Sequence, residues 1–185
     1  MNTKASFDFK YLDAIDVSKI VENLKTFTLE EWNKVSIRQN RFSAHKHTFS
    51  LPIIWDIKSL SKNTKGKLNE YNYNKLEFNL IENELTKIYQ EHYGKGEIFR
   101  VLLAKLKPLQ QIPTHIDGGK SLGIVKRTHI PLITNKDILF TVGGTTKNLK
   151  EGEIWEINNQ NPHSVQNNSE EERVHLIIDY LPEYL

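Results

Sequence analysis

The chain has 185 residues, enough for one domain with a substantial core, and its 38% hydrophobic and 26% charged residues are ordinary for a globular protein. A formal net charge of +2 is too small to favour a nucleic acid or an anionic membrane as a partner. Cysteine is absent, which excludes disulfides, thiolate-bound zinc and iron–sulfur clusters. No stretch has the apolar length of a signal-peptide core or a membrane span, so we expect a single cytoplasmic domain over residues 1–185.

The first half of the chain predicts helices and one strand. An amphipathic pattern predicts a helix over residues 17–27, and Thr28 with Glu31 forms the capping-box pattern that begins another short helix. Residues 48–55 are mostly apolar after a histidine-containing loop and predict a strand. The longest helix is expected over residues 74–92, where apolar side chains recur every three or four positions.

From residue 97 onward the pattern changes to short β-rich runs separated by turn residues. These runs are 98–106, 129–133, 138–142, 153–157 and 173–180. Short strands at this spacing are typical of a β-sandwich or barrel. We therefore predict an α+β, mainly β fold: a double-stranded β-helix of the jelly-roll, cupin-like type over residues 97–182, buttressed by helical and mixed structure over residues 1–96.

Two histidines and an aspartate form a candidate metal site. His115 and Asp117 are two residues apart, so an extended backbone would direct both side chains to one face, and His163 would join them from a later strand. Two imidazoles and a carboxylate on one side of a metal leave the other side open, which suits non-haem Fe(II) better than other ions. The alternative interpretation of the segment is a turn, because Asp117-Gly118-Gly119 is good turn chemistry and so short a motif also arises by chance.

Two further groups of residues could bind carboxylates. Arg173 opens the run 173–180, in which alternation places the odd-numbered residues on one face and four apolar residues on the other. An arginine so placed points into a barrel or at an anion, although a surface arginine is the alternative. Arg127 and His129 share a face and form a second candidate pair, while a buried core histidine is an equally good interpretation of His129 alone.

These residues belong to four motifs whose order, spacing and residue types agree with one protein family. The motifs are His115-x-Asp117, Arg127-x-His129-x-Pro131-Leu132, Gly152-Glu153-x-Trp155-x-x-Asn158-Asn159-x-x-x-His163-x-Val165-x-Asn167 and Arg173-Val174-x-Leu176-Ile177-x-Asp179. Over residues 98–182 the chain resembles the aspartyl/asparaginyl β-hydroxylases, which include bacterial proline hydroxylases and belong to the 2-oxoglutarate/Fe(II) dioxygenases. A fainter match lies in the first half, at His45-x-x-Thr48-x-Ser50-Leu51-Pro52.

The resemblance implies a role for each matching residue. His115 and His163 match the iron-binding histidines, and Arg173 matches the arginine that pairs with the distal carboxylate of 2-oxoglutarate. Arg127 and His129 match residues that help to hold the co-substrate or the substrate.

The chain departs from the animal enzymes of the family at two positions. Those enzymes have glycine where this chain has Asp117, so the iron site here resembles the ordinary three-ligand version. They also have a serine that hydrogen-bonds 2-oxoglutarate where this chain has Ala104, and the sequence does not identify the group that replaces it.

The resemblance implies an Fe(II)- and 2-oxoglutarate-dependent hydroxylase, with ascorbate as a helpful additive in vitro. A free amino acid, a short peptide or a small amino-acid-derived molecule is the expected substrate. Candidates for contacting a substrate carboxylate are Arg41, His45, His47 and Thr48, with a solvated basic loop as the alternative. Candidates for an apolar lining are Ile124, Phe140 and Trp155, each of which could equally be structural.

Three other functions are consistent with parts of the sequence. A cupin-like protein could bind a metal or small ligand without turning it over. A nucleic-acid-binding module would show binding that is lost at moderate salt, and the low net charge argues against it. A zinc hydrolase would keep its activity with zinc in place of Fe(II).

Overall fold

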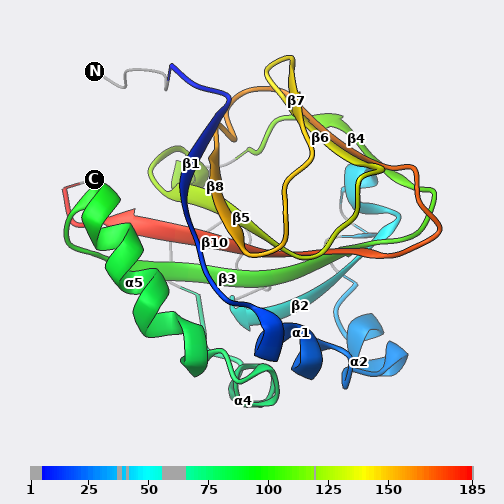
Figure 1. The fold of residues 1–185 in the computed structure, drawn as a ribbon, viewed down its shortest axis with the longest axis horizontal. Coiled ribbons are helices and arrows are strands. Elements are labelled where there is room, and N and C mark those ends of the chain that lie inside the picture. Colours follow the sequence, from blue (N-terminus) through cyan, green and yellow to red (C-terminus); the bar gives the residue numbers. More distant parts are fainter. Residues whose placement is uncertain (1–5, 37–38, 41, 56–65, 119, 185) are drawn as a thin grey trace.

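The computed structural model describes residues 6–36, 39–40, 42–55, 66–118 and 120–184 (Figure 1). Its strands are β1 (Phe9–Ala14), β2 (Thr48–Ile54), β3 (Gly96–Leu106), β4 (Gln111–His115), β5 (Lys126–Ile133), β6 (Ile138–Val142), β7 (Thr145–Lys147), β8 (Glu153–Ile157), β9 (His163–Asn167) and β10 (Arg173–Pro182). Its α-helices are α1 (Ser18–Leu24), α2 (Leu29–Asn33), α4 (Glu70–Leu76) and α5 (Asn79–Tyr93), with short 3-10 helices η1 (Ser43–His45) and η3 (Lys120–Gly123). None of these helices combines the length and the apolar character that crossing a membrane requires.

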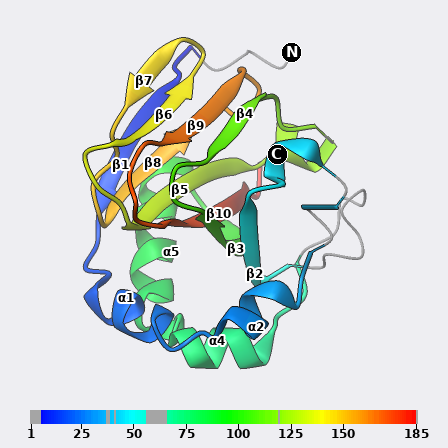
Figure 2. The same ribbon diagram turned by 90° about the vertical axis from the view of Figure 1, so that its right-hand side faces the viewer.

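The strands form two antiparallel sheets, one of six strands in the order β1-β8-β5-β10-β3-β2 and one of four in the order β4-β9-β6-β7. The two sheets lie face to face (Figures 1 and 2), so the predicted mainly β, jelly-roll-like class is confirmed. Strand β1 was not expected, and it joins β2 in extending the larger sheet with residues from the first half of the chain. Strand β2 lies at the edge of this sheet, which is a position where proline, having no backbone N–H to donate, is tolerated; this accounts for Pro52.

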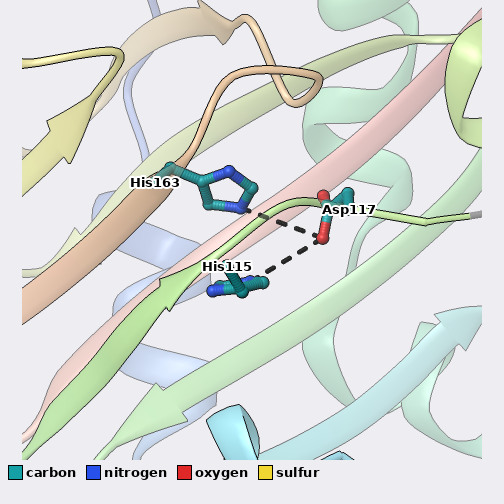
Figure 3. A group of neighbouring side chains, drawn as sticks. All are labelled: His115, Asp117 and His163. Atoms are coloured by element: carbon teal, nitrogen blue, oxygen red, sulfur yellow. Dashed lines mark ion pairs between the residues drawn. The ribbon is translucent and has the colours of Figure 1, made fainter.

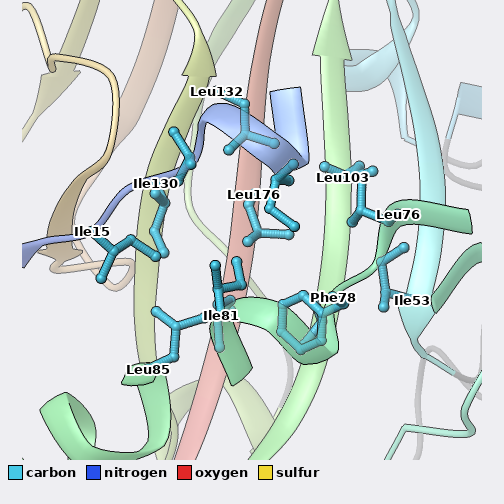
Figure 4. Packing of buried hydrophobic residues seen from close by; sticks show 14 of the residues in the cluster. Ile15, Ile53, Leu76, Phe78, Ile81, Leu85, Leu103, Ile130, Leu132 and Leu176 are labelled. Carbon is cyan, nitrogen blue, oxygen red and sulfur yellow. The ribbon is translucent and has the colours of Figure 1, made fainter. Parts of the chain in front are cut away.

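The larger hydrophobic core lies between the six-stranded sheet and the helices on its outer face (Figure 2). Strand β10 alternates as predicted, and its even-numbered side chains Val174, Leu176, Ile178 and Tyr180 are all fully buried in this core. Leu76, Phe78, Ile81 and Leu85 from the helical half meet Leu103, Ile130, Leu132 and Leu176 of the sheet there (Figure 4). A smaller cluster lies between the two sheets, and it includes Leu106, Ile112, Phe140 and Val165. The odd-numbered face of β10 is therefore left facing the interior between the sheets.

The predicted helix over residues 74–92 is wrong as a single element. Helix α4 ends at Leu76, Glu77 adopts a left-handed conformation with a φ of 55°, and α5 begins two residues later. The break allows both Leu76 and Phe78 to be fully buried, and it leaves Leu80, expected in the apolar stripe, 53% exposed. The capping box at Thr28 is confirmed, with both of its reciprocal hydrogen bonds formed.

Candidate metal centre and co-substrate pocket

Strand pairing brings the two predicted metal-binding histidines together. His115 is the last residue of β4 and His163 the first of β9, and the register of the four-stranded sheet pairs them directly. Directly opposed side chains on neighbouring antiparallel strands lie on one face at close range. The two imidazole centroids are accordingly 4.3 Å apart.

Each histidine is oriented by a backbone carbonyl, which selects the nitrogen left for a metal. Nδ1 of His115 donates to the carbonyl of Pro113 at 2.9 Å, and Nδ1 of His163 donates to that of Asn161 at 3.0 Å. An imidazole whose Nδ1 carries the proton presents Nε2 as a lone-pair donor. Burial also lowers the pKa of His163, which favours its neutral, metal-binding form.

Asp117 completes the triad from the loop that follows β4. Its Oδ1 lies 3.8 Å from Nε2 of each histidine, and the three ligand atoms all lie within 4.8 Å of one another (Figure 3). The loop is tied to the turn before β9, because the Asp117 backbone N–H donates to the carbonyl of Asn159 at 3.3 Å. The Asn159 side chain in turn donates to the carbonyl of Leu122 at 2.9 Å. Two imidazole nitrogens and one carboxylate oxygen on one side of a shared centre fit Fe(II) with an open face.

A pocket with an empty volume of about 460 Å³, its open mouth included, extends from the triad into the space between the sheets. Its apolar lining is Ala104, Ile112, Phe140, Val165 and Ile177, and its polar lining is His45, Thr48, His115, Asp117, Arg127, His129, His163 and Arg173. Of the three residues expected to give it an apolar wall, only Phe140 lines this pocket.

Arg173 is the most unusual member of the pocket lining. The side chain is 1% exposed, and no carboxylate in the described part of the chain forms an ion pair with it. Its Nε has no hydrogen-bond partner within the described residues, and its guanidinium lies 5.8 Å from the centre of the Phe140 ring. Burial lowers its pKa to about 9, because the guanidinium has lost its hydration. A buried guanidinium in this state has the charge and the hydrogen-bond donor that pairing with an anion requires.

His175 is a residue of the site that the sequence motifs did not single out. It lies two residues after Arg173 on the same face of β10, and its Nδ1 accepts a hydrogen bond from Nη2 of Arg173 at 2.6 Å. Burial keeps the pKa of His175 well below its ordinary value, so the imidazole is neutral and can accept from a guanidinium. His175 is also the cross-strand partner of Ala104, the position at which the animal enzymes have a serine. The alternation in β10 was the signal that could have found it.

The depressed pKa of His175 predicts a pH dependence of stability. The unfolded chain takes up a proton on this histidine more readily than the folded protein does. The stability that the neutral imidazole contributes is therefore fully present above about pH 6.5 and is lost as the pH falls below that value. Between pH 7.5 and pH 5.5 the free energy of unfolding should therefore decrease less in His175→Gln than in the unsubstituted protein. The two decreases should differ by about 1.4 kcal/mol. Urea denaturation at the two pH values measures this difference, and equal decreases would show that His175 is not buried as a neutral group.

Arg127 and His129 both line the pocket, but they are held differently. Nε and Nη2 of Arg127 donate to the two carboxylate oxygens of Asp179 at 2.7 and 2.9 Å, and Nη1 donates to Oδ2 of Asp117. Burial acts to lower the pKa of Arg127, but Asp179 and Asp117 outweigh it and raise that pKa. His129 is buried beside Phe140, with ring centroids 5.1 Å apart, and burial keeps its pKa well below the ordinary value. Its Nδ1 has no hydrogen-bond partner among the described residues.

The candidate substrate-contacting residues do not all lie at the pocket. His45 and Thr48 line it, and the His45 ring contacts that of His115 with centroids 5.4 Å apart. His47 is half-buried and is not part of the lining, while Arg41 lies outside the described residues. Thr48 is buried and donates its hydroxyl hydrogen to the carbonyl of His45 at 2.8 Å, which fixes the start of β2 beside the pocket.

Several solved structures share this fold. HygX from Streptomyces hygroscopicus, solved with nickel and 2-oxoglutarate bound, superimposes with a TM-score of 0.62 at 12% identity, covering 96% of this chain and 84% of that one. The viral collagen prolyl hydroxylase of Paramecium Bursaria Chlorella virus-1, in complex with 2-oxoglutarate, gives 0.56 at 10% identity over 97% and 98% of the two chains. An oxidoreductase of the 2OG-Fe(II) oxygenase family from Burkholderia pseudomallei gives 0.58 at 17% identity over 72% of this chain, which spans just 66% of that protein.

Sequence comparison places the chain more narrowly than these structural similarities do. No curated protein sequence matches it significantly. The model of one family, described as Aspartyl/Asparaginyl beta-hydroxylase, matches residues 16–182, which include the four motifs and all three residues of the triad. The chain therefore belongs to the aspartyl/asparaginyl beta-hydroxylase family, a family of 2-oxoglutarate- and Fe(II)-dependent oxygenases.

Proposed function

We propose that this protein is a dioxygenase that hydroxylates a free amino acid, a short peptide or a small amino-acid-derived molecule, using 2-oxoglutarate as co-substrate. One observation carries the proposal. A triad of metal-binding character lies in the same pocket as a buried arginine that has no carboxylate partner in the described part of the chain. A metal at the triad and an anion at Arg173 are the two attachment points that a 2-oxoacid with a far carboxylate needs.

In this proposal His115, Asp117 and His163 hold Fe(II), and Arg173 binds the distal carboxylate of 2-oxoglutarate. When bound, the iron and the co-substrate supply the activation of dioxygen and the oxidising power for a C–H bond. The chain supplies position: the paired strands β4 and β9 fix the two imidazoles, and β10 fixes the guanidinium. The apolar part of the lining limits water around the reacting groups.

His129 and Arg127 are assigned to the co-substrate side of the pocket. His129 lines the pocket, and its unpartnered Nδ1 leaves the imidazole with hydrogen-bonding capacity for a polar ligand. Arg127 lines the pocket and already holds Asp117, so its part in binding is to keep that carboxylate in place.

The substrate class is supported by the pocket mouth and by one similar structure. His45 and Thr48 flank the pocket next to His115, where a small polar molecule would lie between them and the metal. The similar viral enzyme is, by its name, a collagen prolyl hydroxylase, so an amino-acid substrate is compatible with this fold. We also propose that the helices of the first half buttress the six-stranded sheet that carries Arg173.

The test is coupled turnover with a panel of substrates. The protein is loaded with Fe(II) without oxygen and then supplied with oxygen, 2-oxoglutarate, ascorbate and single amino acids or short peptides. We expect succinate to form in step with oxygen consumption, and one candidate to gain 16 mass units. Binding of 2-oxoglutarate without succinate formation from any candidate would instead favour a cupin-like binding protein.

A further inference from the structure

Four side chains of alternating charge, of which Asp117 is half-buried and the other three are buried, extend from the metal triad across the larger sheet. Asp117 is held by Arg127 on β5, and Arg127 is held by Asp179 on β10 through two parallel hydrogen bonds of 2.7 and 2.9 Å. Asp179 also forms an ion pair with Arg100 on β3, with Nε of Arg100 2.8 Å from Oδ2. The strand register places Asp179 directly between the two arginines, as the cross-strand partner of each.

The burial of this chain of charges indicates that its members depend on one another. Asp179 is 1% exposed, while Arg127 and Arg100 are 6% and 7% exposed. A buried carboxylate is tolerated only where opposite charges and hydrogen bonds replace its hydration, and the two arginines provide both. Because Asp179 engages Nε and Nη2 of Arg127 together, the plane of the guanidinium is fixed, and Nη1 is directed at Asp117.

The consequence for the metal site concerns which oxygen of Asp117 is available. Arg127 occupies Oδ2, whereas Oδ1 is the oxygen that lies 3.8 Å from both histidine Nε2 atoms. A carboxylate with one oxygen held in this way offers a metal a single oxygen. The metal then keeps more open coordination positions than it would if the carboxylate bound it through both oxygens.

The same network holds the loop on the far side of Asp117. Nη1 of Arg100 donates to Oγ of Ser121, in η3, at 3.1 Å, and Ser121 is itself buried. The two arginines that meet at Asp179 thus hold the chain at Asp117 and again at Ser121.

We propose that Asp179 is a positioning residue for the metal centre, acting through Arg127 to hold Asp117 as a single-oxygen ligand. The inference rests on the proposed metal site but not on the identity of the substrate or on turnover. It assigns a function to a residue whose ion pairs, among the described residues, are with Arg100 and Arg127, and which lies on a different sheet from the two histidines.

The test measures metal binding without turnover. Co(II) is titrated into the protein anaerobically, and its visible spectrum reports both affinity and coordination. Asp179→Asn should weaken Co(II) binding by roughly 10–100-fold, the usual effect of losing an outer-shell partner, and should change the spectrum toward that of Asp117→Asn. Arg127→Lys keeps the positive charge but cannot hold both carboxylates, so it should show the same change in affinity and spectrum. This variant tests the proposal if Asp179→Asn does not fold.

Two comparisons separate positioning from a general loss of structure. Glu156→Gln removes another buried carboxylate, which accepts a hydrogen bond from Tyr93 at 2.6 Å and, among the described residues, forms no ion pair with either arginine of the network. This variant should leave Co(II) affinity unchanged. In an Asp117→Asn background, Asp179→Asn should have little further effect, because the two substitutions remove one interaction.

Unchanged affinity in folded Asp179→Asn, or an equal loss in the Asp117→Asn background, would overturn the proposal. Failure of the proposed function would appear separately, as absence of succinate formation by a protein that binds Co(II).

Discussion

Replacing Arg173 with methionine is expected to weaken 2-oxoglutarate binding by about 30-fold or more and, at the same time, to stabilise the ligand-free protein. The first effect follows because a carboxylate bound in a buried site loses its charged partner, which costs about 2–5 kcal/mol. The second follows because Arg173 is buried without a carboxylate partner in the described part of the chain, and a buried charge that lacks an opposite charge destabilises the folded protein by its cost of desolvation. Opposite effects on binding and stability are the signature of a group retained for its ligand.

Calorimetric titration of the metal-loaded protein and urea denaturation of the metal-free protein measure the two effects. Oxalate is the matched control ligand, because it chelates a metal but has no distal carboxylate, so its affinity should not change. Arg173→Lys should lose less affinity than Arg173→Met, since it keeps a cation without the guanidinium geometry. Equal losses for oxalate and 2-oxoglutarate would show that Arg173 supports the pocket as a whole and does not bind the distal carboxylate.

The second large effect is expected at His163. Its alanine variant should lose more than the roughly 100-fold in metal affinity that an outer-shell change can cause, because one of three ligands is removed and Asp117 and His115 alone cannot enclose an ion. His92 is the matched control: it is an exposed histidine on α5, hydrogen-bonded to the carbonyl of Leu12 at 3.2 Å, and His92→Ala should bind the metal normally. Anaerobic Co(II) titration of both variants measures the difference. Comparable affinities in the two variants would show that the imidazole at 163 is not a ligand.

Much of the site could be predicted from the sequence because its residues lie in short, regular segments. In β10 the period of two alone separates Arg173 from the apolar residues that face the helices, and the structure agrees. The pairing of His115 with His163 depends on a register between strands 48 residues apart, which no local pattern specifies, although metal-ligand chemistry and the family motifs both indicated His163 as the third ligand. Spacing likewise gave no indication that Arg127 holds Asp117, since the contact joins a loop to a strand of the other sheet.

The errors in the fold have physical causes of the same kind. The apolar stripe over residues 74–92 satisfied the helical period, but burying Phe78 beside the sheet required a left-handed residue at Glu77, which divides the helix. Strand β1 was missed because four of its six residues are Phe9, Lys10, Tyr11 and Asp13, a mixed set that becomes a strand by pairing with β8. In both cases packing against distant residues outweighed the local pattern.

The claim on which the account depends is that one pocket holds both a metal at His115, Asp117 and His163 and a 2-oxoacid that reaches Arg173. The most direct test is the weak visible charge-transfer band of Fe(II) chelated by 2-oxoglutarate, recorded without oxygen. The unsubstituted protein should develop the band, His163→Ala should not, and Arg173→Met should develop it only at much higher 2-oxoglutarate concentrations. A full-strength band in His163→Ala would contradict the account.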